Sequence, residues 1–378
     1  MKSILITGGA GFIGSNLARK LIAKGYRVRI LDSLSRQIHG PDPEITSPLY
    51  KAIKDQVDFL KGDISSGHDL EEAVFGQDAV IHLAAETGTG QSMYEIKRYS
   101  DTNMGGTALL LDFLTNKKHQ VRKIVVASSR AVYGEGKYHC AEHGTVYPEA
   151  RKAADMQNGD FECKCPRCNQ PATPVATTED SKIHPASVYG ITKQVQEQLA
   201  ITVGRSINIP VVALRYQNVY GPGQSLSNPY TGILSIFSTQ IRNGSDINIF
   251  EDGQESRDFV YIDDVTDATV MALENDEANY QAFNVGSGKP VSVLKVAETL
   301  RENYHSGVRI NISGNYRVGD IRHNYAALSK IAAILNYRPR FSFENGIAAF
   351  CRWVAKQDPR PDQSASAIEE LKKKGLYR

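Results

Sequence analysis

The sequence ILITGGAGFIG, residues 4–14, decides the fold. A short apolar run of strand type leads directly into glycines spaced three apart, which open a segment with helical periodicity. Gly8 and Gly11 allow the backbone to turn sharply and to approach a pyrophosphate that rests on the positive end of the helix dipole. Gly14 permits close contact between helix and sheet. The stretch therefore predicts the first strand, phosphate-binding turn and helix of a dinucleotide-binding unit.

Short aliphatic or β-branched runs alternate with helical segments along most of the chain. The runs lie at residues 4–7, 27–31, 57–60, 79–83, 123–127 and 211–214. This alternation predicts an α/β fold with a Rossmann-like, doubly wound parallel sheet. Beyond residue 221 the alternation thins, and it resumes at 259–273 and 282–285. We expect an NAD-binding domain at 1–220 and a smaller, discontinuous substrate lobe at 221–378, with 258–286 returning to the first domain.

Composition and charge exclude several classes of protein. The chain has 44 basic and 42 acidic residues, and this near balance gives no field that would recruit nucleic acid or an anionic membrane. No stretch approaches the ~20 apolar residues of a membrane span, and the N-terminus starts a strand pattern rather than a signal peptide. The five cysteines form an odd set that argues against a secreted disulfide framework. A cytoplasmic location is expected.

Asp32 ends the second predicted strand, 18 residues beyond Gly14. A carboxylate at that place in a dinucleotide-binding unit bonds the ribose hydroxyls of the adenosine. Because it would repel a 2′-phosphate, we expect NAD rather than NADP. Arg36, four residues later, is the feature that speaks for NADP. The alternative interpretation of Asp32 is an ordinary turn residue.

Ser129, Tyr189 and Lys193 form a candidate set for hydride-transfer chemistry. Tyr189 and Lys193 are four residues apart, so on a helix the phenol and the ammonium share one face. Free tyrosine, with a pKa near 10, is a poor base, and a neighbouring positive charge favours its phenolate form. Ser129 ends a predicted strand, where α/β sheets bind ligands. Taken alone, the Tyr189 and Lys193 pair would be read as a surface pair.

These motifs make the chain similar to the extended short-chain dehydrogenase/reductase family of nucleotide-sugar enzymes. The resemblance rests on residues 7–14, 63–64, 82–85, 103–107, 128–134, 189–193, 214–222, 257–260 and 317–320. It implies cofactor contacts from Gly8, Gly11, Phe12, Ile13, Asp32, Asp63, Ile64, Leu83, Ala84, Ala85, Asn103, Ala127, Tyr189, Lys193, Tyr216, Asn218 and Val219. It implies substrate contacts from Thr87, Ser129, Asn218, Asn228, Arg257 and Arg317.

The reaction is read from positions that differ within that family. Its 4,6-dehydratases carry an Asp and a Glu at the positions of Arg130 and Ala131, and its decarboxylases keep the Glu. This chain has neither carboxylate, so the resemblance favours a 4-epimerase, in which Tyr189 takes the proton of the C4 hydroxyl and the 4-keto sugar turns over before it is reduced. The alternatives are another nucleotide-sugar epimerase, a 4-ketoreductase, a lyase and a non-enzymatic NAD-binding scaffold. Arg130 is unusual among epimerases, and it could reach the sugar or the flap rather than the cofactor.

Residues 135–184 insert about 50 residues without a strong helix or strand period, far longer than an ordinary loop. They contain Cys140 and His143, then, after 21 residues, Cys165 and Cys168. Paired ligands with two-residue spacers suit a closed, tetrahedral structural zinc site. Cys163 could replace His143, and four reduced cysteines without metal are the alternative. We expect a zinc-stapled flap that covers the sugar.

A narrower resemblance connects the chain to the subfamily of bacterial dTDP-L-rhamnose 4-epimerases. It rests on residues 90–96, 133–136, 140–144, 165–168 and 227–232. It implies a dTDP-6-deoxyhexose substrate, with dTDP-6-deoxy-L-talose as the product for surface polysaccharide synthesis. The broader family resemblance implies that residues 247–250 receive the pyrimidine base and that a homodimer forms through helices around 103–114 and 189–202.

Overall fold

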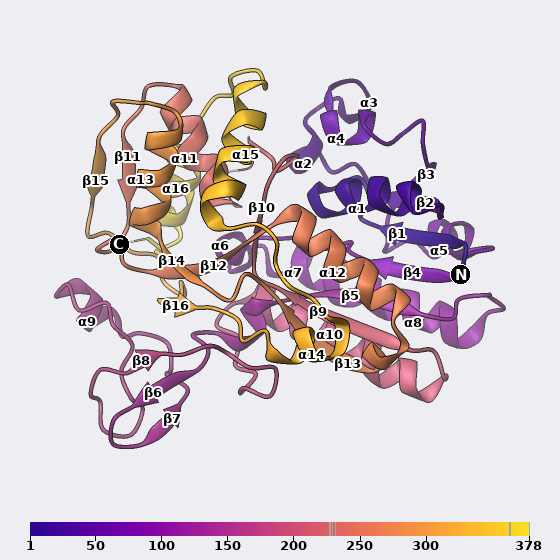
Figure 1. The fold of residues 1–378 in the computed structure, drawn as a ribbon, viewed down its shortest axis with the longest axis horizontal. Helices are drawn as coiled ribbons and strands as arrows, with labels where there is room; N and C mark the ends of the chain where they lie inside the picture. Colours follow the sequence, from indigo (N-terminus) through magenta and orange to yellow (C-terminus); the bar gives the residue numbers. More distant parts are fainter. Residues whose placement is uncertain (227, 229, 231, 363, 378) are drawn as a thin grey trace.

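The computed structural model describes residues 1–226, 228, 230, 232–362 and 364–377. Seven parallel strands form the central sheet in the order β13-β9-β5-β4-β1-β2-β3 (Figure 1). Their bounds are β1 (Ser3–Thr7), β2 (Arg27–Asp32), β3 (Asp58–Lys61), β4 (Ala79–His82), β5 (Ile124–Ser129), β9 (Val211–Tyr216) and β13 (Gln281–Val285). The strand order reverses direction between β1 and β4, the point at which such sheets bind ligands. The predicted Rossmann-like sheet is confirmed.

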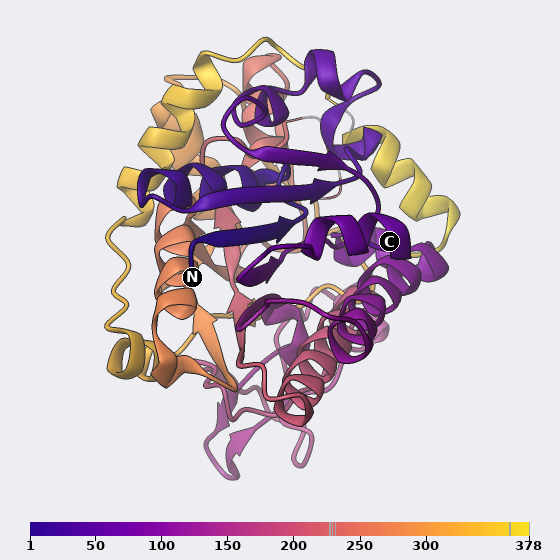
Figure 2. The same ribbon diagram turned by 90° about the vertical axis from the view of Figure 1, so that its right-hand side faces the viewer.

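Helices cover both faces of the sheet, as Figure 2 shows. Because alternate strand residues point to opposite faces, Ile4 and Ile6 enter one apolar layer and Leu5 enters the other. The first layer is covered by α1 (Phe12–Ala23), α12 (Ile262–Glu274) and α14 (Ser329–Leu335). The second is covered by α5 (Gly67–Val74), α8 (Gly106–Asn116) and α10 (Val188–Ser206).

Short turns complete this part of the molecule. They are α2 (Arg36–His39), α3 (Pro43–Thr46), α4 (Pro48–Lys51), α6 (Thr89–Ser92), α7 (Ile96–Tyr99), the π-helical η1 (Ser100–Gly105), and the 3-10 turns η2 (Arg130–Tyr133) and η3 (Asp276–Ala278). No helix in the described part of the chain is both long enough and apolar enough to cross a membrane.

A smaller lobe packs beside the central sheet around a third apolar core. Its strands are β10 (Asn218–Tyr220), β12 (Ser256–Tyr261), β14 (Pro290–Ser292) and β16 (His323–Asn324), with a separate pair β11 (Ile247–Ile249) and β15 (Ile310–Ile312). Its helices are α11 (Ile233–Arg242), α13 (Val293–Asn303), α15 (Phe343–Ala355) and α16 (Ser364–Lys373). Of residues 258–286, expected to return to the central sheet, α12 and β13 do so, whereas β12 lies in the smaller sheet.

The insertion at 135–184 has regular structure that the sequence pattern did not predict. It contains β6 (Tyr138–Cys140), β7 (Gly144–Val146), β8 (Thr173–Pro174) and α9 (Ala153–Gln157), with strand order β7-β6-β8. Strands of two or three residues are too short to show a period of two, which explains the missed elements. The expected flap over the sugar is also wrong in position, because none of the described residues 135–184 lines the main cavity.

Candidate active site

One cavity of about 920 Å³ lies at the carboxyl ends of the central strands and extends into the smaller lobe. Nearly all residues predicted to bind cofactor or substrate line it. They are Gly8, Gly11, Phe12, Ile13, Asp32, Asp63, Ile64, Leu83, Ala84, Ala85, Thr87, Ala127, Ser129, Tyr189, Lys193, Tyr216, Asn218, Val219, Arg257 and Arg317. The predicted contacts therefore converge, although they are drawn from the whole length of the chain.

Asn103 and Asn228 are the two predicted contacts that the structure does not place in the cavity wall. Asn103 is fully buried, and its amide bonds the backbone N–H and carbonyl of Glu86 at 2.7 and 3.1 Å and the Thr192 hydroxyl at 2.9 Å. Asn228 accepts a bond from the Tyr230 N–H at 3.1 Å. Both side chains therefore brace loops that carry lining residues.

The glycine-rich turn fits a dinucleotide. Gly8 has φ +69°, and a Cβ there would lie 2.7 Å from the Ala84 nitrogen, so only glycine fits. Helix α1 begins after Gly11 without a side-chain cap, which leaves its first N–H groups for a pyrophosphate. Asp32 accepts bonds from the N–H groups of Ala10 and Leu34 at 2.9 and 2.8 Å and fixes the turn. Burial raises the pKa of Asp32, and these bonds oppose the rise.

Ser129 and Tyr189 meet because α10 starts against η2. Ser129 ends β5, and its Oγ accepts a hydrogen bond from the Ala131 N–H at 3.2 Å. Ser187 caps α10 by accepting a bond from the Gly190 N–H at 3.1 Å. A Cβ on Gly190 would lie 2.6 Å from the Ala131 carbonyl oxygen, so the helix approaches η2 as closely as a glycine allows. The close approach places Tyr189 beside Ser129, and their side chains are hydrogen-bonded.

Burial and local charge set the protonation of this group. Burial raises the pKa of Tyr189, while the hydrogen bond with Ser129 and the positive charge of Arg130 lower it. Burial lowers the pKa of Lys193 to about 7. The Lys193 ammonium donates a bond to the Gln196 side-chain oxygen at 2.8 Å. Burial therefore favours the neutral form of both side chains, and a nearby anion would favour the charged form of the lysine.

Two predicted phosphate-binding arginines line the far end of the cavity. Arg257 donates to three backbone carbonyl groups at 2.6 to 2.9 Å, which fix its guanidinium. Arg317 forms an ion pair with Asp320 at 2.9 Å and lies over the Phe250 ring at 5.1 Å. Phe250 and the preceding residues 248–249 also line the cavity, where the base was expected. Guanidinium groups in fixed orientations suit a diphosphate.

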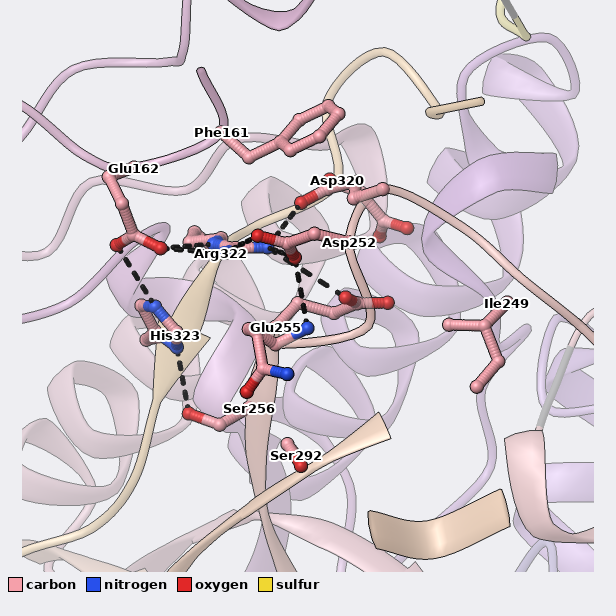
Figure 3. A network of polar contacts seen from close by, with 12 residues as sticks. Phe161, Glu162, Ile249, Asp252, Glu255, Ser256, Ser292, Asp320, Arg322 and His323 are labelled. Atoms are coloured by element: carbon pink, nitrogen blue, oxygen red, sulfur yellow. Dashed lines mark hydrogen bonds and ion pairs between the residues drawn. The ribbon is translucent and has the colours of Figure 1, made fainter. Parts of the chain in front are cut away.

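Arg322 joins the insertion to the smaller lobe, a role that no sequence motif indicated (Figure 3). Its side chain is 1% exposed and bonds Glu162 of the insertion at 2.6 Å. On the other side it bonds Asp252 at 2.7 Å and Glu251 at 2.9 Å. The neighbouring His323 lies 3.3 Å from Glu162. The network fixes the insertion against the strand that carries Arg257.

The insertion brings its predicted metal ligands together. Ligand atoms of Cys140, His143, Cys165 and Cys168 all lie within 4.8 Å of one another. The Cys140 and Cys168 sulfurs are 3.7 Å apart, and the Cys165 sulfur is 3.6 Å from His143 Nδ1. Cys163 is wrong as a substitute ligand, because it lies outside this group, and its thiol faces Glu135 and Tyr138.

Helix α16 closes part of the cavity, and this too was missed. Ala367, Ile368 and Leu371 line the cavity, and Glu370 accepts a hydrogen bond from the Tyr230 hydroxyl at 2.5 Å. The sequence of α16 is rich in charge, with Lys372 and Lys373 in its last turn. The apolar face is only three residues wide and carries no motif, so no local signal could have identified it.

These features define a dinucleotide-dependent enzyme of the short-chain dehydrogenase/reductase class: the parallel sheet, the cavity at its carboxyl edge, and the group formed by Ser129, Tyr189 and Lys193. The sequence profile of the NAD dependent epimerase/dehydratase family matches residues 4–155 and 164–286. The dTDP-L-rhamnose 4-epimerase of Burkholderia thailandensis is 37% identical over 358 residues, which cover 94% of this chain and 96% of that protein.

Two solved structures share the fold. A UDP-glucose 4-epimerase from Thermotoga maritima, solved with UDP-glucose, has a TM-score of 0.76 and 28% identity, covering 94% of this chain and 99% of that one. A UDP-glucuronic acid 4-epimerase from Bacillus cereus, in complex with UDP-glucuronic acid and NAD, has a TM-score of 0.75 and 27% identity with the same coverage. The chain therefore belongs to the NAD dependent epimerase/dehydratase family and is an NAD-dependent nucleotide-sugar epimerase, an isomerase.

Proposed function

We propose that the protein is a 4-epimerase that interconverts dTDP-L-rhamnose and dTDP-6-deoxy-L-talose. The observation that carries the reaction is the meeting of Ser129, Tyr189 and Lys193 at a cavity wall where positions 130 and 131 hold no carboxylate. The similarity to the Burkholderia thailandensis enzyme over 94% of the chain supports the choice of sugar nucleotide. The other relatives named above act on UDP-sugars, so the test compares both nucleotides.

The side chains of Ser129, Tyr189 and Lys193 together remove and return one proton, that of the C4 hydroxyl. When bound, NAD supplies the hydride acceptor for oxidation of the sugar at C4 and the hydride donor for its reversal. Tyr189 takes the proton of the C4 hydroxyl through its phenolate oxygen, and Ser129 holds the same sugar oxygen by a hydrogen bond. Lys193, one helical turn away, supplies positive charge that favours the phenolate. Tyr189 returns the proton after the sugar has turned over.

The far end of the cavity holds the substrate while the sugar turns. Arg257 and Arg317 would bind the diphosphate, the first fixed by backbone carbonyls and the second by Asp320. A cavity of about 920 Å³ is within the ordinary range for a small-molecule site. Because only the diphosphate is anchored, the hexose is free to rotate. Either face of C4 can then be turned toward the cofactor side of the cavity.

Incubation of the purified enzyme with dTDP-L-rhamnose and a panel of UDP-sugars, without added reduced cofactor, tests the proposal. We expect the C4 epimer of dTDP-L-rhamnose, identified by proton NMR of the sugar. Tyr189→Phe should lower the rate at least ~100-fold, because general base catalysis contributes about that much. Conversion that requires external NADH would identify a ketoreductase, and an active Tyr189→Phe enzyme would contradict the mechanism.

We propose further that Cys140, His143, Cys165 and Cys168 bind a structural zinc ion. Tetrahedral thiolates at a Zn–S distance of about 2.3 Å are separated by about 3.8 Å, close to the 3.7 Å between Cys140 and Cys168. A disulfide would need about 2.05 Å, and all of these cysteines are free. Zinc binding would supply folding energy to a lobe whose own apolar core is small.

Metal analysis of protein purified without chelator tests the zinc proposal. We expect one zinc ion per chain, lost in Cys168→Ser. The matched control is Cys163→Ser, which should keep the metal because Cys163 lies outside the ligand group. Wild-type protein without zinc, or zinc lost equally from both variants, would contradict the proposal.

A homodimer through α8 and α10 is the third part of the proposal. The two helices pack against each other on one face of the sheet. Ile191 on α10 is 46% exposed and Ile96 on the adjoining α7 is 54% exposed, which suits a covered face better than a solvated one. Light scattering should give twice the chain mass, and Ile191→Asp should give the monomer. A monomeric wild-type protein would refute this part.

A further inference from the structure

Three arginines line the cavity, and Arg130 is the least satisfied of them. Arg257 makes three hydrogen bonds to carbonyl groups, and Arg317 is paired with Asp320. Within the part of the chain that the structure describes, the Arg130 guanidinium makes one hydrogen bond, from Nε to Asn218 Oδ1 at 3.2 Å, and no ion pair. The four N–H groups of its terminal nitrogens therefore have no protein acceptor there.

The position of Arg130 limits what could supply these acceptors. It directly follows Ser129 at the start of η2, and its charge acts on both Tyr189 and Arg257. The proposed function places the reacting C4 at Tyr189 and the diphosphate at Arg257. The hexose joins these two groups, so a guanidinium that lines the same cavity and whose charge acts on both Tyr189 and Arg257 is placed to reach the hexose.

We propose that Arg130 contacts the hexose of the substrate, donating hydrogen bonds from Nη1 and Nη2 to sugar oxygens beside Tyr189. The proposal rests on the proposed function and extends it to a residue for which the family resemblance implies no role. Buried N–H groups normally have acceptors, and a cavity-facing guanidinium without a counter-ion is typical of a ligand contact.

The positive charge of Arg130 also affects the pKa of Tyr189. Burial lowers the pKa of Arg130 to about 10, with a further lowering from the like charge of Arg257. The group therefore stays protonated at neutral pH. The ionisable groups whose charges act on Arg130 are Arg257, Asp320, Tyr189 and Glu135. Those that interact with Tyr189 are Arg130 and Tyr99 on α7, and Lys193 follows on the same helix. Because the charge of Arg130 lowers the pKa of Tyr189, its loss should raise the pH at which the base works.

Binding measurements with Arg130→Met separate a hexose contact from a diphosphate contact. Calorimetry should show unchanged affinity for dTDP and about 10- to 100-fold weaker affinity for dTDP-L-rhamnose, the value of lost hydrogen bonds to a charged group. Arg317→Met is the matched control, since it should weaken both ligands by the same factor. Equal weakening of both ligands by Arg130→Met would overturn the hexose contact.

The pH profile of NAD reduction by substrate tests the effect on Tyr189. In Arg130→Met the midpoint should move to higher pH, whereas Arg130→Lys, which keeps the charge, should stay near the wild-type midpoint. A purely structural role would lower the amount of folded enzyme without moving the midpoint. If wild-type enzyme converts no sugar nucleotide, the proposed function fails; if it does and both Arg130 variants bind and titrate as wild type, only this inference fails.

Discussion

Gly190→Ala is the sharpest test of how the fold places the reacting groups. Gly190 lies in the first turn of α10 with an ordinary helical backbone, so alanine is compatible with its conformation. The added Cβ would lie 2.6 Å from the Ala131 carbonyl oxygen and 2.9 Å from the Pro185 side chain. To reach an ordinary contact of 3.4 Å, the helix and η2 must separate by 3.4 minus 2.6, or about 0.8 Å. That separation would move Tyr189, which precedes Gly190, away from Ser129, which lies two residues before Ala131.

A displacement near 1 Å at reacting groups can lower a rate about 100-fold. We therefore expect kcat to fall about 10- to 100-fold in Gly190→Ala, measured under saturating substrate by NMR of the epimerised sugar. Stability should fall as well, since the helix preference for alanine over glycine, about 1 kcal/mol, offsets only part of the strain. The melting temperature, followed by circular dichroism, checks this second expectation.

Gly204→Ala is the control on the same helix. Its Cβ would lie 2.7 Å from the Ile209 carbonyl oxygen, a clash of similar size at the opposite end of α10. It should lower stability and leave the kcat of the folded enzyme unchanged. Gly67→Ala, in α5, meets nothing within 4 Å and should change neither quantity. Wild-type kcat in Gly190→Ala, or an equal loss in Gly204→Ala, would refute the argument that this contact sets the geometry.

Three other perturbations have defined outcomes. Glu197→Ala should cost about 3–5 kcal/mol of unfolding free energy in urea, because it leaves buried Arg215 without its ion-pair partner at 2.5 Å. Burial and the charge of Glu251 raise the pKa of Glu255 to about 7. Ionisation of Glu255 therefore lowers the free energy of unfolding as the pH rises from about 4.5 to 7. Glu255→Gln should restore up to about 3 kcal/mol at pH 8 but nothing at pH 4. A chain that ends at residue 361 lacks the α16 wall at Leu371 and should release 4-keto sugar, detected by mass spectrometry; intact turnover without release would count against that wall.

The nucleotide-binding half could be predicted from the sequence because its signals are local. The glycine turn, Asp32 and the spacing of Tyr189 from Lys193 each lie within one element or one turn. Six of the seven central strands follow from runs of apolar residues before residue 215, and the seventh from the run at 282–285. Periodicity and turn chemistry act over a few residues, so a single sequence carries them.

The remaining features depend on contacts between distant residues. Asn103 is a polar residue of the kind that lines binding cavities, yet its amide hydrogen-bonds the backbone of Glu86, 17 residues away. Arg322 bonds Glu162, 160 residues away, and a sequence alone does not show which charges are buried together. Helix α16 lines the cavity through three apolar residues in an otherwise charged segment. None of these roles has a local pattern from which it could be read.

The Arg322 contact also changes the role that we assign to the insertion. No described residue of the insertion lines the cavity, so zinc would not act on the sugar through a covering flap. The insertion instead holds Arg322 through Glu162, and the Arg322 carbonyl accepts a hydrogen bond from Arg257 at 2.8 Å. The lobe proposed to bind zinc is therefore linked through Glu162 and Arg322 to Arg257, the guanidinium proposed to hold the diphosphate. Loss of the metal should therefore appear first as weaker substrate binding, with the Tyr189 chemistry intact.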